Sequence, residues 1–370
     1  MDLRQISLVF CLTTGLSVLF TWLVRGAMRK VGILDFPKDR KAHPHPVAYE
    51  GGIAMYLAFV AGLVTALHLS PELWLSADRQ MVGLLIGATA TVGLGMTDDL
   101  LDLKPWVKLL GQIGIGYLMY RFGFAIERVS NPLGGQMTVW APLSLLGTVM
   151  WYALLMNGLN MIDGLDGLAA GIAAISAATL CAISLDLGQY AGALISVLVL
   201  GACLGFLPFN FKPATIFMGD AGSLLLGFLL AGTALMSSTK APALLALLMP
   251  LLALGLPIFD TIFAFFRRAI RGQHPFRGDR RHLHHRFLQL GFSERRTVLT
   301  FYYITAYLGV TAYVLQRLEA RSTLALVVII SMGMLVLVEN MRFLETVRGP
   351  AAPESGEQDV SSEDDVGGHS

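Results

Sequence analysis

Apolar segments of about 20 residues recur from one end of the chain to the other, and they restrict it to a membrane fold. About 20 residues of α-helix are needed to cross a bilayer. With 55% hydrophobic and 14% charged residues, a soluble domain of 370 residues has too little interior to bury them all. The sequence therefore predicts an all-α, polytopic integral membrane protein. The eleven predicted spans are roughly 5–24, 48–68, 80–97, 106–122, 140–157, 161–184, 190–207, 214–236, 241–263, 299–316 and 322–340.

Lysine and arginine are distributed unequally between the two sides of these predicted spans. If the N-terminus lies outside, 20 of the 27 basic residues fall in the inner loops and the C-terminal segment. Cytoplasmic loops carry the excess of Lys and Arg. We therefore expect the N-terminus outside and the C-terminus in the cytoplasm, with residues 1–348 forming one transmembrane domain. Residues 349–370 contain six carboxylates and no Lys or Arg, which predicts a disordered, acidic cytoplasmic tail.

Paired acids follow the third predicted span, in the inner-loop stretch GMTDDLLDLK at residues 95–104. Asp98 and Asp99 are adjacent, so on a helix their side chains diverge by about 100°. Two such carboxylates can reach one cation from two directions, and Mg²⁺ prefers oxygen ligands. Lys108 begins the next span and offers a point charge to a phosphate. We interpret Asp102 as a residue of a solvated turn.

Polar side chains also interrupt the segment NGLNMIDGLDGLAAG, at residues 157–171. Asn157, Asn160, Asp163 and Asp166 recur every three residues, so they cannot share one face of an ideal helix. The intervening glycines predict a helix that is either locally broken or closely approached by a neighbour, and membrane depth permits irregular backbone only where it lines a cavity. In a further inner loop, Asp220 stands alone at the head of an apolar run. This position fits either a helix cap or a metal ligand.

Basic side chains gather in the first and last inner loops. In the first loop they fit either ordinary positive-inside charge or a patch for a lipid phosphate. In the last loop, three histidines lie among arginines with no Cys or other fourth zinc ligand at suitable spacing, which favours phosphate binding over zinc. The basic residues concerned are Arg40, Lys41 and His43 in the first loop, and Arg281, His282, His284, His285 and Arg286 in the last.

Acids suited to a hard divalent cation and bases suited to phosphate are thus expected on one side of the membrane. This combination predicts metal-assisted phosphoryl chemistry on a diphosphate. No Walker A or GxGxxG motif is present. A secondary transporter is the alternative class, but its polar groups would concentrate near the midplane and need access from both sides.

Four motifs together resemble the polyprenyl-phosphate N-acetylhexosamine-1-phosphate transferases, a membrane family of the glycosyltransferase 4 type. They are DDLLDLK, NMIDGLDGLAAG, FMGDAGSLLLGF and DRRHLHHRF, in the family's order. The His-x-His-His form of the last motif is similar to the undecaprenyl-phosphate branch that uses UDP-N-acetylglucosamine. One departure lies in the first loop, where the family's Pro-x-x-Gly-Gly is here Ala48-Tyr-Glu-Gly-Gly.

The resemblance implies that an undecaprenyl phosphate oxygen attacks the sugar-side phosphorus of UDP-N-acetylglucosamine and that UMP leaves. It also implies a bacterial inner membrane location with the site on the cytoplasmic face, and Mg²⁺ or Mn²⁺ as cofactor. Its implied catalytic residues are Asp98, Asp99, Asp163 and His284, and its metal ligands are Asp220 and Asn160. Its implied substrate-binding residues are Lys108, Asp166, Asn157, His282, His285, Arg281 and Arg286, with Arg40, Lys41 and His43 at the lipid phosphate.

Several alternatives stay open at this point. The sugar is either N-acetylglucosamine or another N-acetylated hexosamine, and transfer of phospho-N-acetylmuramoyl-pentapeptide is the less favoured option. The downstream glycan and the choice between a monomer and a homodimer are also open, and no nucleic acid partner is expected. A phosphate monoester has a second pKa near ~6, so it is mostly dianionic at pH 7 and gains little from a base. We therefore expect Asp98 and Asp99 to organise the cation and the attacking phosphate.

Overall fold

The computed structural model describes residues 3–36, 46–69, 72–130, 136–238, 255 and 287–317. All of them belong to one compact unit, Met1–Ala325. The boundary expected between residues 348 and 349, the acidic tail and the predicted spans 241–263 and 322–340 lie outside the described residues, apart from Gly255.

Helices dominate the described part of the chain, and eight of them are long and apolar enough to cross a membrane. The protein is therefore a mostly helical, multi-pass membrane protein. The helices are α1 (Leu3–Val31), α2 (Gly51–Leu69), α3 (Glu72–Leu101), α4 (Pro105–Arg121), α5 (Ala141–Ile162), α6 (Leu168–Asp186), α7 (Tyr190–Asn210), α8 (Gly219–Ser238) and α12 (Glu294–Leu315). Of these, α4 falls short of the length of a candidate span.

Two short hairpins connect helices. Strand β1 (Leu34–Asp35) pairs antiparallel with β2 (Val47–Ala48), and β3 (Arg128–Ser130) pairs antiparallel with β4 (Gln136–Thr138). Ala48 also forms a parallel bridge with Ile216, in the loop between α7 and α8. This bridge ties the segment that precedes α2 to the segment that precedes α8.

Nine of the eleven predicted spans coincide with these helices, although several helix ends differ from the predicted ones by five to eight residues. The span predicted at 161–184 does not begin at residue 161, because α5 continues to Ile162 and α6 begins only at Leu168. Residues 163–167 form a turn between the two helices. Of the two arrangements that the glycines predict, this turn is the locally broken helix, and Gly167 adopts the left-handed conformation (φ 79°) at the N-cap of α6.

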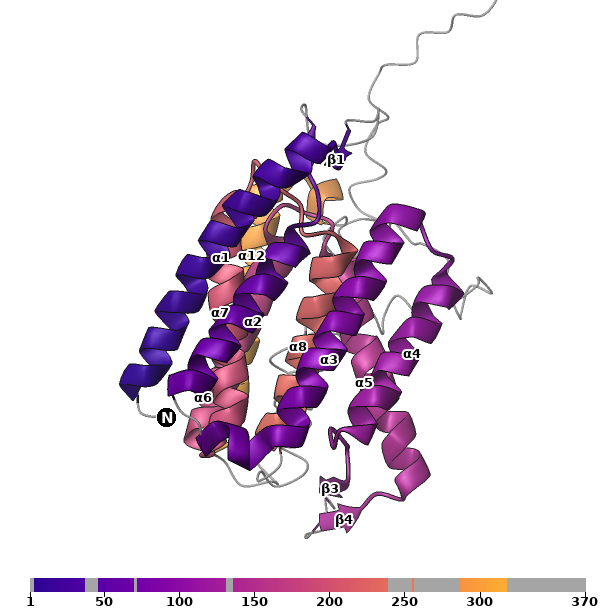
Figure 1. The fold of residues 1–370 in the computed structure, drawn as a ribbon, viewed down its shortest axis with the longest axis vertical. Helices are drawn as coiled ribbons and strands as arrows, with labels where there is room; N and C mark the ends of the chain where they lie inside the picture. The colour runs from indigo at the N-terminus through magenta and orange to yellow at the C-terminus, as the bar shows by residue number, and fades with distance from the viewer. Residues whose placement is uncertain are drawn as a thin grey trace, which may run out of the picture. The chain divides into compact units, whose positions relative to one another are not determined.

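Helix α8 is the buried centre of the described bundle and contacts α2, α3, α5, α6 and α7 (Figure 1). Small residues allow its first turn to approach two neighbours closely. A Cβ atom at Gly52 of α2 would lie 2.2 Å from the Gly222 nitrogen, and one at Gly95 of α3 would lie 2.4 Å from the Ala221 Cα. These contacts bring the end of α3 against the start of α8, where the polar residues gather.

Candidate active site

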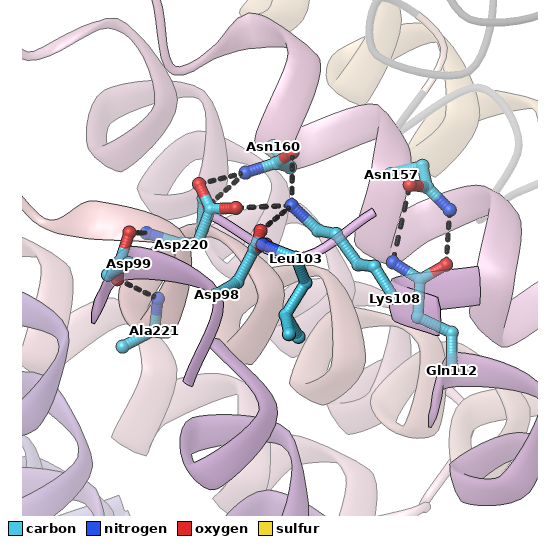
Figure 2. A network of polar contacts seen from close by, with 10 residues as sticks. Asp98, Asp99, Leu103, Lys108, Gln112, Asn157, Asn160, Asp220 and Ala221 are labelled. Atoms are coloured by element: carbon cyan, nitrogen blue, oxygen red, sulfur yellow. Dashed lines mark hydrogen bonds and ion pairs between the residues drawn. The ribbon is translucent and has the colours of Figure 1, made fainter. Parts of the chain in front are cut away.

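Polar side chains from four helices meet where those helices begin or end. Asp98 and Asp99 lie in the last turn of α3, and Lys108 lies in the first turn of α4. Asn160 lies in the last turn of α5, and Asp220 is the second residue of α8. Figure 2 shows these side chains pointing toward one another. The structure therefore brings together five of the residues that the sequence singles out.

The Lys108 ammonium is the centre of this cluster. Its Nζ atom lies 2.7 Å from Asp98 Oδ2, donates to Asn160 Oδ1 at 3.1 Å, and forms an ion pair with Asp220 Oδ2. The Lys108 side chain is only 14% exposed, so these contacts are weakly screened by water. Three oxygens from three helices therefore converge on one positively charged atom (Figure 2).

Asp99 has a different task from its neighbour. Its Oδ1 accepts a hydrogen bond from the Asp220 backbone N–H at 2.9 Å, and its Oδ2 accepts one from the Ala221 N–H at 3.1 Å. The first turn of a helix has backbone N–H groups without partners inside the helix, and a carboxylate there is favoured by the helix dipole. Asp99 thus caps α8 from α3 and fixes the position of Asp220.

Asn160 fixes the other side of Asp220. Its Nδ2 donates to Asp220 Oδ1 at 2.7 Å and to Ser223 Oγ at 3.0 Å, which leaves Oδ1 facing the Lys108 ammonium. Asn157, one turn earlier on α5, lies apart from the cluster. It exchanges two hydrogen bonds with the buried Gln112 of α4, at 2.6 and 3.2 Å (Figure 2).

Asp163 and Asp166 lie on the turn between α5 and α6. Asp163 is partly buried, and burial together with the negative charges of Asp220, Asp99 and Asp166 raises its pKa well above the usual carboxyl range. Asp166 Oδ2 accepts a hydrogen bond from the Ala214 backbone N–H at 3.0 Å. Asp166 therefore joins this turn to the loop between α7 and α8.

The other sequence-predicted site residues lie outside the described residues. They are Arg40, Lys41 and His43 in the first loop, and Arg281, His282, His284, His285 and Arg286 in the last. Within the described ranges, no three His, Cys, Asp or Glu side chains lie close enough to hold a metal ion by themselves.

Glu50, which precedes α2, lies near Asp99 and Asp220, and the sequence motifs did not identify it as a site residue. It is 2% exposed, adopts a left-handed backbone conformation (φ 71°), and neither of its carboxyl oxygens has a hydrogen-bond partner among the residues that the structure describes. Burial, with added repulsion from Asp99 and Asp220, raises its pKa to about 7. The departure from the family's Pro-x-x-Gly-Gly pattern falls on this segment and was the one signal pointing to it.

Replacing Glu50 with Gln is expected to make thermal stability less dependent on pH. Above about pH 4.5 the Glu50 carboxyl group of the unfolded chain loses its proton, whereas in the folded protein it keeps the proton until about pH 7. Wild-type stability therefore falls between these values and stays lower above them, by at most about 3 kcal/mol. In detergent, Glu50→Gln should raise the Tm at pH 8 and leave it almost unchanged at pH 5.

The exposed Glu127 offers a matched control for Glu50. Glu127→Gln should leave the Tm unchanged both at pH 5 and at pH 8. An equal gain from Glu50→Gln at both pH values would contradict this account of the buried carboxyl.

The fold and this cluster define a polytopic membrane protein whose charged, oxygen-rich site lies at helix ends instead of mid-span. Residues 81–238, which run from within α3 to the end of α8, match the model of Glycosyl transferase family 4. The chain is 32% identical to a probable undecaprenyl-phosphate N-acetylglucosaminyl 1-phosphate transferase of Bacillus subtilis, over 92% of this chain and 93% of the relative.

Two further relatives agree with this match. The chain is 35% identical to a decaprenyl-phosphate N-acetylglucosaminephosphotransferase of Mycobacterium tuberculosis, over 84% of this chain and 82% of the relative. It is 28% identical to the undecaprenyl-phosphate alpha-N-acetylglucosaminyl 1-phosphate transferase of Escherichia coli, over 78% and 77%. The chain therefore belongs to the polyprenyl-phosphate N-acetylhexosamine-1-phosphate transferases of glycosyl transferase family 4, as its motifs predicted.

Proposed function

We propose that this protein transfers N-acetylglucosamine 1-phosphate from UDP-N-acetylglucosamine to undecaprenyl phosphate. The products are UMP and a lipid-linked diphosphate sugar, the first unit of a cell-surface polysaccharide such as O-antigen, common antigen or a teichoic-acid linkage unit. Family membership supports the reaction class. The observation that carries the proposal to this chain's residues is the convergence of Asp98, Asn160 and Asp220 oxygens on the Lys108 ammonium.

In the proposed reaction, a lipid phosphate oxygen forms a bond to the sugar-side phosphorus. The bond between that phosphorus and the bridging oxygen breaks, and UMP leaves with the bridging oxygen and its electron pair. Both substrates are anions, so the main task of the protein is to place positive charge between them. Lys108 supplies such a charge, because its ammonium is a compact positive charge whose N–H groups can donate hydrogen bonds to phosphate oxygens.

The oxygen atoms of the cluster suit a hard divalent cation as ligands. We propose that this cation is Mg²⁺, with Mn²⁺ as the alternative. Carboxylate and amide oxygens are the ligands such ions prefer, and Asp220 and Asn160 would hold it. When bound, the cation supplies charge that offsets the repulsion between the two phosphates. Asp99 holds Asp220 in place through the α8 backbone, and Asp98 holds the Lys108 ammonium beside it.

The proposed setting is the inner membrane of a bacterium, with the site on the cytoplasmic face. The excess of Lys and Arg in the inner loops supports this orientation. We further propose that the turn carrying Asp163 and Asp166 contacts the nucleotide-sugar. The roles of Arg40, Lys41, His43, Arg281, His282, His284, His285 and Arg286 in phosphate binding remain predictions.

A panel of UDP-sugars tests the choice of donor. Purified protein with undecaprenyl phosphate should form the most organic-extractable product from UDP-N-acetylglucosamine, compared with UDP-N-acetylgalactosamine, a UDP-6-deoxy-N-acetylhexosamine and UDP-N-acetylmuramoyl-pentapeptide. The epimers differ in a few hydrogen bonds, so the preference measures the site directly. Faster turnover of any other donor would assign the enzyme to that sugar.

A further inference from the structure

Gly167 forms hydrogen bonds with side chains from two helices that lie far from it in the sequence. This residue follows Asp166, is buried, and is the N-cap of α6, with a left-handed backbone that suits glycine. Its N–H donates to Asn210 Oδ1 of α7 at 3.1 Å, and its carbonyl accepts a hydrogen bond from Tyr302 Oη of α12 at 2.6 Å. Both backbone polar groups of this one residue therefore form hydrogen bonds with side chains, and the carbonyl also accepts the Gly171 backbone N–H at 3.0 Å.

Asn210 connects the same turn to the loop that precedes α8. It is 3% exposed, and its Nδ2 donates to the Ile216 carbonyl at 3.0 Å while its Oδ1 accepts from Gly167. Asp166 makes a second link to this loop through the Ala214 N–H. The Asn210 amide thus fixes the separation between the Asp163–Asp166 turn and the segment leading to Asp220.

Tyr302 also sets how α12 packs against α6. A Cβ atom at Gly171 would lie 2.0 Å from the Tyr302 hydroxyl, so the aromatic side chain occupies space that only glycine leaves open. At the start of α12, Glu294 forms an ion pair with Lys212 of the loop between α7 and α8. Helix α12 is therefore connected both to the turn and to the loop.

We propose that Asn210 and Tyr302 are positioning residues that hold the Asp163–Asp166 turn in the conformation that binds the nucleotide-sugar. This inference rests on the proposed function. The turn contains Gly164 and Gly167 within five residues, so its backbone has many accessible conformations without external support. Neither positioning side chain contacts the Lys108 cluster in the hydrogen bonds of the described residues, so their loss should weaken binding of the donor more than the chemical step.

Tyr302→Phe is the sharpest test, because it removes the hydroxyl and keeps the ring over Gly171. Loss of one hydrogen bond to a buried carbonyl should raise the KM for UDP-N-acetylglucosamine by about fivefold to tenfold. The kcat and the KM for undecaprenyl phosphate should stay within about twofold of wild type. Asn210→Ala should change the same KM in the same direction and by more, since it removes two hydrogen bonds.

Tyr303→Phe is the matched control, because Tyr303 lies next on the same helix and is 74% exposed. It should leave all constants unchanged. If Tyr302→Phe lowered the Tm without raising the donor KM, or raised both KM values equally, the inference would be overturned. A wild-type protein that released UMP from no UDP-sugar would overturn the proposed function and this inference together, whereas an active wild type with an unchanged donor KM in Tyr302→Phe would overturn the inference alone.

Discussion

Asp220→Asn is expected to lower kcat/KM by about a thousandfold or more, equivalent to about 4 kcal/mol of transition-state stabilisation. Asp220 is where the Lys108 ammonium, the Asn160 amide and the start of α8 meet. The substitution removes a negative charge from the proposed cation position while preserving shape. The amide also places N–H hydrogens against either the ammonium or the Asn160 amide, so the cluster loses its arrangement as well as its charge.

The measurement is UMP release over a range of Mg²⁺ concentrations, with the Tm recorded for each variant. Activity of Asp220→Asn should stay low at every concentration, and half-maximal activity should require more Mg²⁺. Asp102→Asn is the control, because Asp102 is exposed and lies just after α3. It should stay within about twofold of wild type. Near-normal activity of Asp220→Asn at ordinary Mg²⁺ would remove Asp220 from the proposed cation site.

Asp99→Asn is expected to lower kcat by about a hundredfold, and raising the pH should not restore it. Asp99 accepts two backbone N–H groups of α8, and an Asn side chain can accept only one of them. The other N–H then faces an amide NH₂ group, so the first turn of α8 and Asp220 within it shift. The defect is therefore in charge placement.

A pH–rate profile of Asp99→Asn, measured at several Mg²⁺ concentrations, separates this account from general-base catalysis. We expect a parallel loss at all pH values and a greater requirement for Mg²⁺. Rescue at high pH with an unchanged Mg²⁺ requirement would show that Asp99 acts as a base on the lipid phosphate. Asp98→Asn extends the test to the neighbouring carboxylate, which contacts the Lys108 ammonium and the Leu103 N–H instead.

The helices could be predicted because the bilayer imposes a simple length and polarity rule. The break between α5 and α6 was one of two arrangements that the glycines between residues 157 and 171 indicated. The sequence predicted that Asp98, Asn160 and Asp220 lie on the same side of the membrane. Their individual contacts were not predictable, because adjacent carboxylates look alike in sequence. The two carboxylates differ because α3 packs closely on α8, which Gly95 permits. In this packing Asp99 caps the N-terminus of α8, whereas Asp98 forms an ion pair with Lys108.

Residues that act through long-range contacts were the hardest to find from sequence. Gln112 pairs with Asn157 across 45 positions, and Tyr302 reaches Gly167 across 135. Neither side chain belongs to a charged motif, and a tyrosine in an apolar helix is usually interpreted as a packing residue. Glu50 was within reach, since it stands in the one stretch that departs from the family's pattern.

Following the phosphorus atom tests the central claim most directly. Purified protein is given undecaprenyl phosphate and UDP-N-acetylglucosamine labelled at the sugar-side phosphate, and the organic and aqueous phases are counted. We predict that the label moves with the sugar into the organic phase, with one UMP released for each lipid product. Label retained in the aqueous phase as UDP would mean transfer of the sugar without its phosphate, and it would contradict the proposed reaction.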